Sequence, residues 1–261
     1  MTAQLYLVPA GALTGVAPGA VVTLDGDEGH HAATVKRARV GEELLLGDGE
    51  GVLAHGVVDA VETGRGSGKD SARRGGSVAV RVVSVGDPVV SSPRYILAQA
   101  LAKGGRDELA VETATELGVD EIVPWQAARS IVTWRGDRGE RSRDKWQSTA
   151  RTAAKQSRRA TVPHVAPAAT TAQLTQRVGE SALALVLHED ADLPLGRVEL
   201  PAHGEVVLVV GPEGGIDRSE LQTLTAAGAV AVRLGTEVLR ASTAGPAALA
   251  VLCSRTRWDA L

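Results

Sequence analysis

The 261-residue sequence has one cysteine, one methionine and no phenylalanine, and aromatic residues make up only 2% of it. A single cysteine excludes an internal disulfide framework and a cysteine-based zinc site. Cys253 lies in an apolar run and is interpreted as a core residue. Since 44% of the residues are hydrophobic, the core has to be built from Val, Leu, Ile and Ala. Such aliphatic content is typical of buried parallel strands covered by helices.

Long apolar runs are also missing. The opening residues MTAQLYLVPA lack a basic region followed by an apolar one, so no signal peptide is predicted. No stretch approaches the ~18 apolar residues that a membrane-spanning helix needs. We therefore expect a reducing, cytoplasmic setting with no membrane partner.

A strong overall charge is absent as well. The net charge of −3 argues against a surface that is coated by nucleic acid throughout. The charges are unevenly distributed, because residues 135–159 contain nine basic and three acidic side chains. A near-neutral protein with one basic segment is suited to binding a polyanion locally.

The first part of the sequence has the pattern of a small β domain. Short runs of alternating apolar residues are separated by turns such as Gly47-Asp48-Gly49, which is typical of a small barrel. The polar, basic segment Glu62–Ser77 is either an unstructured hairpin tip or an RNA contact. A domain over residues 1–86 is predicted, with strands at Val21–Leu24, Glu43–Leu46, Val52–Val58 and Val78–Val85.

From residue 87 onward strands and helices alternate, which predicts an α/β domain with a parallel sheet over residues 87–261. Gly118 and Gly228 are expected to end helices, and Asp217 with Glu220 has the pattern of a capping box. Strands are predicted at Tyr95–Leu101, Val119–Trp125, Leu183–Leu187, Val206–Val210 and Ala229–Leu234. Helices are predicted at Asp107–Leu117, Lys145–Arg159, Asp217–Ala227 and Thr243–Arg255, the second with Arg151, Lys155, Arg158 and Arg159 on one side.

Two segments carry the most chemical information. In Val206–Glu220 a buried strand leads into Gly-Pro-Glu-Gly-Gly and then a capped helix, and such glycines let a backbone approach a ligand closely. In Val232–Leu249 a strand leads through Leu239-Arg240 into a helix, with Pro246 expected in its first turn. The first segment is neither a Walker nor a GxGxxG loop, and as a glycine-rich turn alone it is a weak signal. The second segment by itself is equally compatible with a tight strand–helix connection.

Taken together, the two motifs resemble the SPOUT class of methyltransferases. More narrowly, the chain resembles the ribosomal RNA small subunit methyltransferase E family. The resemblance covers nearly the whole chain. Besides Gly211–Gly215 and Leu234–Ala244, it rests on Glu116–Val119, Pro124, Arg129-Ser130, Gln156–Arg159, Pro163, His31, Val35, Arg37 and Gly41.

The resemblance implies a fold and an activity. A small PUA-like β-barrel would precede a C-terminal α/β domain with a deep trefoil knot, a topology that periodicity alone would not suggest. The protein would use S-adenosylmethionine to methylate the N3 position of a uridine in 16S rRNA of the small ribosomal subunit. Members of the SPOUT class are usually homodimers, so a homodimer is expected. The apolar helix Ala247–Cys253 would form either that interface or part of the core.

The resemblance also implies a cofactor site built from three loops at strand ends, where α/β sheets usually bind ligands. Backbone groups would hold the adenine edge, and Leu187, Leu234, Val238 and Leu239 would wall the ring. The implied cofactor-binding residues are Leu187, His188, Gly211, Pro212, Glu213, Gly214, Gly215, Leu234, Gly235, Val238, Leu239, Arg240, Thr243 and Ala244.

Two arginines are the catalytic candidates. A cation beside the uracil carbonyls would stabilise the anion that develops when N3 loses its proton. Arg240 is the first candidate, because it lies on a cofactor loop, and Arg129 is the second. Alternatively, Arg240 pairs with a carboxylate such as Glu213 and merely braces the loops. No residue is identified as the base.

Several basic segments are expected to hold the RNA, mainly through its phosphates and shape. Trp125, Trp134 and Trp146 are the few candidates for base stacking, although Trp146 is expected in a core. His30 and His31 have no partner at ligand spacing, so no metal is predicted. The predicted RNA-binding residues are Arg37, Lys103, Arg106, Arg129, Arg151, Lys155 and Arg159, with Lys36 and Arg39 beside the first.

The chain departs from the family pattern at three positions. Ser242 stands where many members have Glu, Thr113 where Lys is usual, and Lys155 where Glu is frequent. Two alternatives therefore stay open beside the N3 methyltransferase. One is a SPOUT enzyme that acts on another RNA or another atom, and the other is an RNA-binding assembly factor that has lost catalysis.

Overall fold

The computed structural model describes residues 3–63 and 76–258. The segment 62–77, predicted as a loop, therefore lies mostly outside the described residues. The chain forms two compact units. The first comprises residues 1–90 together with 154–162, and the second comprises residues 91–153 together with 163–261. No helix in the described ranges is long and apolar enough to span a bilayer.

The first unit contains a five-stranded sheet in the order β1-β3-β4-β5-β2. All its ladders are antiparallel except the parallel pairing of β1 with β3. The buried sides of the strands enclose one apolar cluster, which includes Tyr6, Leu46 and Val80. The elements are β1 (Gln4–Leu7), β2 (Val21–Leu24), α1 (Gly26–His30), the short π-helix η1 (His31–Val35), β3 (Glu43–Gly47), β4 (Leu53–Glu62) and β5 (Ser77–Val85).

Residues 154–162 pack with this first unit, although they follow it by many residues in the sequence. Val162 packs against Leu5 and Leu7, and its amide donates a hydrogen bond to the carbonyl of Gly49 at 2.8 Å. Lys155 Nζ lies 2.7 Å from both carboxylate oxygens of Glu28. The side chains of this pair are only 21% and 17% exposed, so it is a partly buried ion pair that fixes the segment.

The second unit contains a parallel sheet in the order β12-β10-β11-β6-β7-β8, with β9 also paired to β7. The predicted parallel α/β sheet is therefore confirmed. Its strands are β6 (Arg94–Ala100), β7 (Glu121–Gln126), β8 (His164–Val165), β9 (Ala169–Thr170), β10 (Leu183–Leu187), β11 (Glu205–Val210) and β12 (Val230–Val232).

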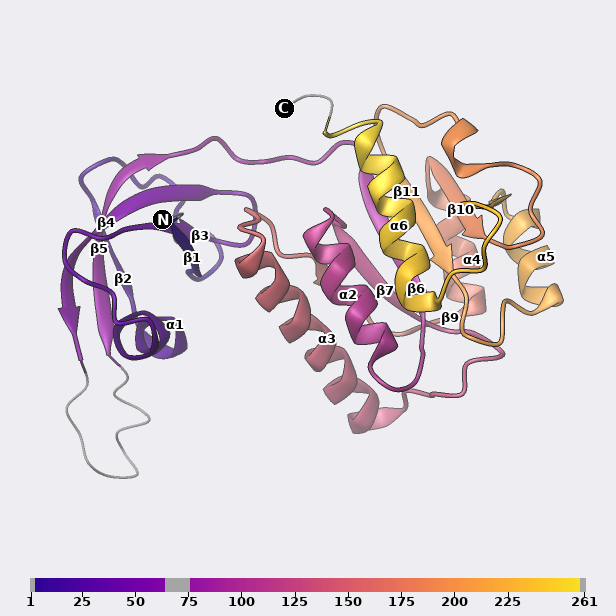
Figure 1. Cartoon of the computed structure of the whole chain (residues 1–261), viewed down its shortest axis with the longest axis horizontal. Helices are drawn as coiled ribbons and strands as arrows, with labels where there is room; N and C mark the ends of the chain where they lie inside the picture. The colour runs from indigo at the N-terminus through magenta and orange to yellow at the C-terminus, as the bar shows by residue number, and fades with distance from the viewer. Residues whose placement is uncertain (1–2, 64–75, 259–261) are drawn as a thin grey trace. The chain divides into compact units, whose positions relative to one another are not determined.

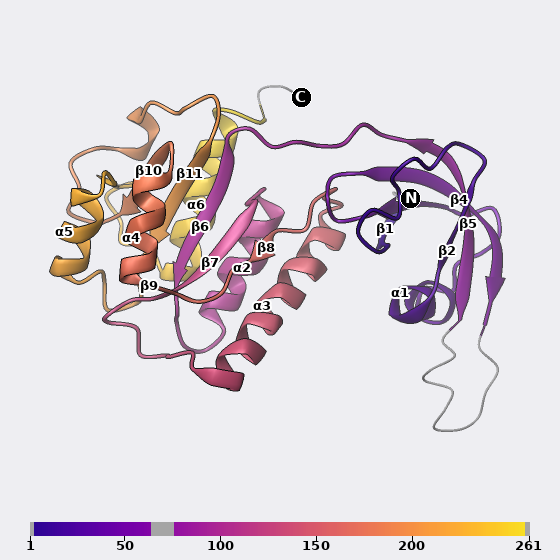
Figure 2. The same ribbon diagram turned by 180° about the vertical axis from the view of Figure 1, so that it is seen from behind.

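Helices cover both faces of this sheet. Apolar residues of α2, α3 and α6 pack in one cluster on the face seen in Figure 1, and those of α4 and α5 pack in a second cluster on the opposite face, seen in Figure 2. The helices are α2 (Arg106–Glu116), α3 (Gly136–Gln156), α4 (Thr171–Glu180), α5 (Arg218–Ala226) and α6 (Ala241–Ser254), with the 3-10 turn η3 at Leu195–Arg197.

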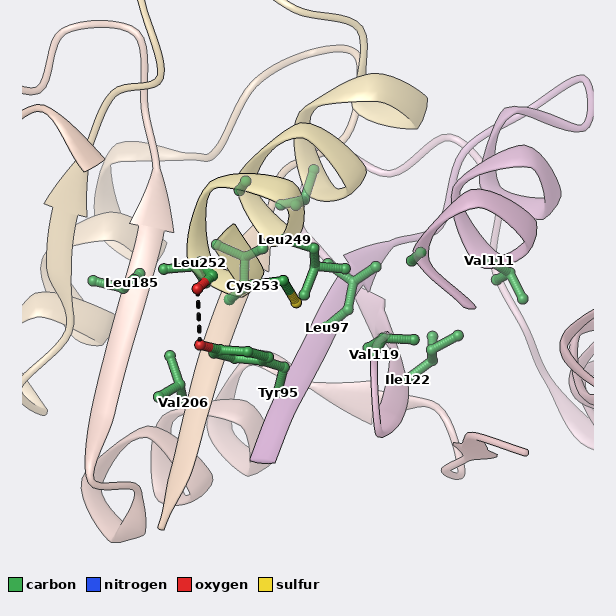
Figure 3. Packing of buried hydrophobic residues seen from close by; sticks show 14 of the residues in the cluster. Tyr95, Leu97, Val111, Val119, Ile122, Leu185, Val206, Leu249, Leu252 and Cys253 are labelled. Carbon is green, nitrogen blue, oxygen red and sulfur yellow. Dashed lines mark hydrogen bonds between the residues drawn. The ribbon is translucent and has the colours of Figure 1, made fainter. Parts of the chain in front are cut away.

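The closing helix α6 belongs to the core (Figure 3). Leu249, Leu252 and Cys253 are completely buried, and the hydroxyl of Tyr95 donates to the carbonyl of Leu252. The interpretation of Cys253 as a core residue is therefore confirmed. Of the two roles left open for this helix, its buried apolar residues serve the core of their own chain.

The segment between β10 and β11 contacts the end of α6. Arg255, just after α6, donates from its guanidinium to the carbonyls of Leu195 and Val198, and both of those residues join the cluster that contains α6. The segment that follows α6 therefore packs against a loop that precedes it in the sequence.

Several predicted boundaries differ from the structure. α3 begins nine residues before the predicted Lys145 and ends at Gln156, so Arg158 and Arg159 do not lie on the helix. Arg158 has a φ of 56°, and the amide of Arg159 bonds to the carbonyl of Ala154, which together form a left-handed helix end. The prediction that four basic residues share one side of this helix is therefore wrong for Arg158 and Arg159.

The start of α6 also differs from the prediction. The helix begins at Ala241 rather than Thr243, so Pro246 lies in its second turn. There the proline cannot supply the amide hydrogen that the carbonyl of Ser242 would accept in a regular helix. The expected ends at Gly118 and Gly228 are confirmed, because both glycines have positive φ values of 105° and 107° directly after a helix.

A network of ion pairs at the start of β6, β7 and β11 leads to a prediction about how stability depends on pH. Glu121 lies 2.5 and 2.8 Å from Arg177, and Arg94 and Glu205 complete the network. Burial alone would raise the pKa of Glu121, but hydrogen bonding and charge from Arg177 outweigh burial and hold it below its ordinary value. Deprotonated Glu121 thus stabilises the fold above its unfolded pKa of about 4.3, and this contribution is lost as the pH falls through the lower folded pKa.

We expect the unfolding free energy of the wild type to fall more steeply between about pH 5 and pH 3 than that of Glu121→Gln, which cannot titrate at this position. Denaturant titrations at a series of pH values measure both slopes. Equal slopes in the two proteins would show that Glu121 does not contribute to acid sensitivity.

Candidate functional site

Three loops meet at one edge of the parallel sheet, because the carboxyl ends of β10, β11 and β12 point the same way. They enclose two adjoining cavities of about 80 Å³ and about 300 Å³. Both cavities are lined by Leu187, His188, Glu189, Val238, Leu239 and Ala244.

The smaller cavity has an apolar wall. Leu187 and Leu234 are partly buried in it, whereas Val238 is 78% exposed and Leu239 is 38% exposed. Apolar side chains that line a concave surface and still face solvent are suited to cover a flat apolar group such as a purine ring. The remaining lining residues here are Val232, Arg233, Gly235 and Glu237.

The Gly211–Gly215 loop forms part of the larger cavity, and its shape depends on glycine. A Cβ atom on Gly211 would lie 2.6 Å from Cγ1 of Ile216, which is too close for any real side chain. Gly215 has a φ of 72° and its amide donates to the carbonyl of Pro212, which closes a tight turn. The predicted capping box of Asp217 and Glu220 then starts α5 and is confirmed.

Glu213 of this loop contacts the segment that follows β6. Its Oε1 lies 3.4 Å from Nη1 of Arg106 and 3.4 Å from the amide of Lys103. Arg106 lines the larger cavity. The sequence predicts RNA binding for this residue and does not place it at the cofactor site. The partner of Glu213 is therefore Arg106, and the suggested brace between Glu213 and Arg240 is not formed.

Arg240 also lines the larger cavity and precedes α6 directly. Its carbonyl accepts hydrogen bonds from the amides of Thr243 and Ala244, which fixes its backbone at the start of the helix. Its side chain is exposed and makes no ion pair within residues 3–63 and 76–258. A cation in this position is available to a ligand in the cavity.

Arg129 has a different environment. Its guanidinium donates to the carbonyl of Gly214 at 3.1 Å and pairs with Asp217 at 3.1 Å. Hydrogen bonds from Ser219, and then the charge of Arg129, hold the pKa of Asp217 below its ordinary value. Arg129 thus fastens the outside of the glycine loop, and it does not line either cavity.

Most of the residues that the sequence assigned to the cofactor line one or both cavities, with Gly214 and Thr243 as the exceptions. Ser242 is buried and is also not part of the lining. Sequence reasoning missed Glu189, Val210, Ile216, Val232, Arg233, Glu237 and Ala241, all of which adjoin a predicted residue or motif and could have been found by extending each motif.

The predicted RNA-binding residues divide between the two units. Lys103, Arg106, Arg129 and Arg151 belong to the second unit, whereas Arg37, Lys155 and Arg159 belong to the first. Arg37 is exposed and has a φ of 54°. The charge of Lys155 is matched by Glu28 inside the first unit, and Arg159 donates to the hydroxyl of Thr161. These two residues therefore have structural partners.

Two tryptophans predicted as stacking candidates are not accessible. Trp125 is completely buried, and Trp146 is 2% exposed and packs edge-on against Trp134 at 4.9 Å between ring centroids. The expectation of a core position for Trp146 is confirmed, and the suggestion that Trp125 stacks on a base is wrong. In the described part of the chain, no three His, Cys, Asp or Glu side chains are grouped as metal ligands would be.

Comparison with known proteins assigns both parts of the chain. Residues 90–253 match the model of an RNA methyltransferase domain, and residues 24–65 match that of an RNA methyltransferase PUA domain. Ribosomal RNA small subunit methyltransferase E from Mycobacterium tuberculosis is 48% identical over 247 residues, which cover 93% of this chain and 90% of that protein. The chain belongs to the ribosomal RNA small subunit methyltransferase E family. Its counterpart from Bacillus subtilis is 29% identical over 90% of both chains.

Solved structures of family members share the fold. The crystal structure of ribosomal RNA small subunit methyltransferase E from Neisseria gonorrhoeae, bound to S-adenosyl methionine, superposes with a TM-score of 0.80 at 26% identity and covers 98% of each chain. A putative methyltransferase from Legionella pneumophila, in complex with the same cofactor, gives a TM-score of 0.78 at 27% identity, covering 98% of this chain and 99% of that one. The predicted family and fold class, a SPOUT α/β domain after a PUA-like β domain, are confirmed.

Proposed function

We propose that this protein transfers a methyl group from S-adenosylmethionine to the N3 position of a uridine in 16S rRNA. The observation that carries the proposal is the pair of adjoining cavities at the ends of β10, β11 and β12, in a chain of this family. One cavity has an apolar wall for a purine ring, and the other is lined by the exposed Arg240, which can face an RNA base. Residues 1–86 would act as the RNA-gripping domain and residues 87–261 as the methyltransferase domain.

The cavities fit the cofactor in shape and chemistry. The apolar wall of Leu187, Leu234, Val238 and Leu239 suits the adenine ring. Gly211 lets the loop that lines the larger cavity pack closely against Ile216. The S-adenosyl methionine bound by the relatives from Neisseria and Legionella supports the assignment. The cofactor supplies a methyl carbon activated by the neighbouring sulfonium. The protein has to orient the uracil and stabilise its anion.

Arg240 is the catalytic residue of this proposal. When the N3–H proton leaves, negative charge spreads to the two neighbouring carbonyl oxygens of the base. The exposed guanidinium of Arg240, at the wall of the larger cavity, would donate to such an oxygen and stabilise the anion. The carbon–sulfur bond then breaks as the N3–carbon bond forms, and the N3 proton goes to solvent.

Arg129, the second candidate, would act as a positioning residue. Its bonds to Gly214 and Asp217 hold the glycine loop from outside the cavity. We infer that Arg129 affects cofactor binding through this loop and does not contact the uracil. Arg106, another predicted RNA-binding residue, lines the larger cavity and pairs there with Glu213.

The small ribosomal subunit or its 16S rRNA is the proposed partner, and a cytoplasmic homodimer is the proposed form. The PUA domain match and exposed Arg37, Lys103 and Arg151 support RNA contacts to phosphates. Lys155 would contribute less, because its charge is matched by Glu28 within the first unit. No metal is required, since a sulfonium transfers its methyl group without a Lewis acid.

Product analysis tests the function. Purified protein is incubated with methyl-labelled cofactor and either naked 16S rRNA or the assembled small subunit, both from cells that lack this modification. Digested nucleosides are then separated and identified by mass spectrometry. We expect label in N3-methyluridine at one position. Label in another nucleoside would favour a different SPOUT specificity, and cofactor binding without any transfer would favour the inactive assembly factor.

A further inference from the structure

The ring of His188 is held in one orientation at the wall of both cavities. His188 follows β10, and its amide donates to the carbonyl of Val232 at 2.9 Å. Its ring Nδ1 accepts a hydrogen bond from the amide of Asp190 at 3.2 Å, and its carbonyl accepts from the amide of Ala191. The backbone and the ring of this residue are therefore both fixed by the same short turn.

The bond from Asp190 determines which ring nitrogen carries the proton. A backbone amide is always a donor, so Nδ1 has to present a lone pair to it. In the neutral ring the single proton then lies on Nε2, which becomes a donor. Within residues 3–63 and 76–258 no acceptor is bonded to Nε2. The ring consequently offers one free N–H at the wall of the site.

The place of this N–H indicates what it contacts. His188 lines both the smaller and the larger cavity, together with Leu187, Val238 and Leu239. A cofactor that extends from one cavity into the other has to pass this shared wall. In S-adenosylmethionine the ribose connects the adenine to the sulfonium chain, so the ribose of a cofactor with its adenine in the smaller cavity would lie at the junction.

We propose, on the basis of the function proposed above, that neutral His188 donates a hydrogen bond from Nε2 to a ribose oxygen of the cofactor. His188 is thereby a cofactor-binding side chain and not only part of a loop whose backbone contacts adenine. The same tautomer excludes His188 as the base for N3–H, because Nε2 already carries a proton and Nδ1 is occupied by Asp190.

Two amide substitutions separate the two ring nitrogens. His188→Asn keeps an oxygen near Nδ1 that can accept from Asp190, but its shorter side chain has no donor at the position of Nε2. His188→Gln places an amide N–H near that position. Titration calorimetry measures the affinity of both variants for S-adenosylmethionine and for 5′-methylthioadenosine, which has the ribose but no amino-acid chain. We expect His188→Asn to weaken binding of both compounds about tenfold and His188→Gln to weaken it less than about threefold.

Other outcomes would overturn the proposal. Wild-type affinity in His188→Asn would show that Nε2 makes no bond to the cofactor, and equal losses in both variants would show a role of ring shape alone. No binding by the wild type would instead overturn the proposed function itself. Nitrogen chemical shifts of the wild-type ring give a test that needs no variant: Nε2 should be protonated and Nδ1 unprotonated, and cofactor should shift the Nε2–H signal. The opposite tautomer would contradict the proposal.

Discussion

Replacing Gly211 by alanine is expected to weaken S-adenosylmethionine binding by about 10- to 100-fold, since overpacking a close contact costs about 1–3 kcal/mol. The added Cβ would lie 2.6 Å from Cγ1 of Ile216 and 3.3 Å from its backbone nitrogen. Ile216 is buried in the second core cluster, so it cannot move away freely. The strain has to be relieved by the loop that lines the larger cavity.

Gly214 of the same loop provides a matched control. A Cβ there would meet only ordinary contacts, the nearest being 3.4 Å from Cβ of Arg129. Gly214→Ala should therefore bind the cofactor within about twofold of the wild type, as exposed substitutions usually do. Calorimetric titration of both variants, together with their melting temperatures, measures the difference. Equal affinities of the two variants would show that the cofactor does not depend on the shape of this loop.

Replacing Arg240 by alanine is expected to lower kcat by about 100- to 1,000-fold, the usual effect of losing one donor to a developing oxyanion. The affinity for S-adenosylmethionine should change little, because the exposed guanidinium acts on the uracil in this account. Arg240→Lys should recover part of the rate, since it restores a cation without the planar fork. Single-turnover methylation of the small subunit measures kcat apart from binding.

Arg129→Ala is the comparison for this prediction. It removes the bonds to Gly214 and Asp217, so the glycine loop loses its outer brace. We expect weaker cofactor binding and a smaller loss of kcat at saturating cofactor. The reverse pattern, with chemistry lost in Arg129→Ala and kept in Arg240→Ala, would exchange the roles of the two arginines.

The five longest strands and several helix ends of the second unit could be predicted from local sequence, because each depends on neighbouring residues. Asp217 with Glu220 forms the expected capping box, and Gly118 and Gly228 end helices as expected. The helix α4 and the strands β1, β8 and β9 were not predicted. Their apolar patterns are short, and packing in the tertiary structure decides such segments.

Partners that lie far apart in the sequence could not be predicted. Lys155 looked like one of a row of RNA-binding cations, and only the fold brings it to Glu28. Arg158 takes a left-handed conformation that glycine usually adopts, so α3 ends where no signal was visible. Residues 154–162 belong to the first unit because of such contacts, and no local sequence pattern indicates this.

The candidate site was predicted at the level of loops and not of contacts. The resemblance indicated which residues lie on the three loops, and most of them line the cavities. It did not indicate that Glu213 pairs with Arg106, that Arg129 braces Gly214, or that the Asp190 amide sets the tautomer of His188. These interactions depend on distances of a few ångströms between loops, which motifs do not encode.

A crystal structure of this protein with S-adenosylmethionine tests the central claim most directly. We predict that the adenine ring lies against Leu234, Val238 and Leu239 in the smaller cavity and that the transferable methyl group faces the larger cavity beside Arg240. A cofactor bound at another edge of the sheet, or a methyl group turned away from Arg240, would contradict the account.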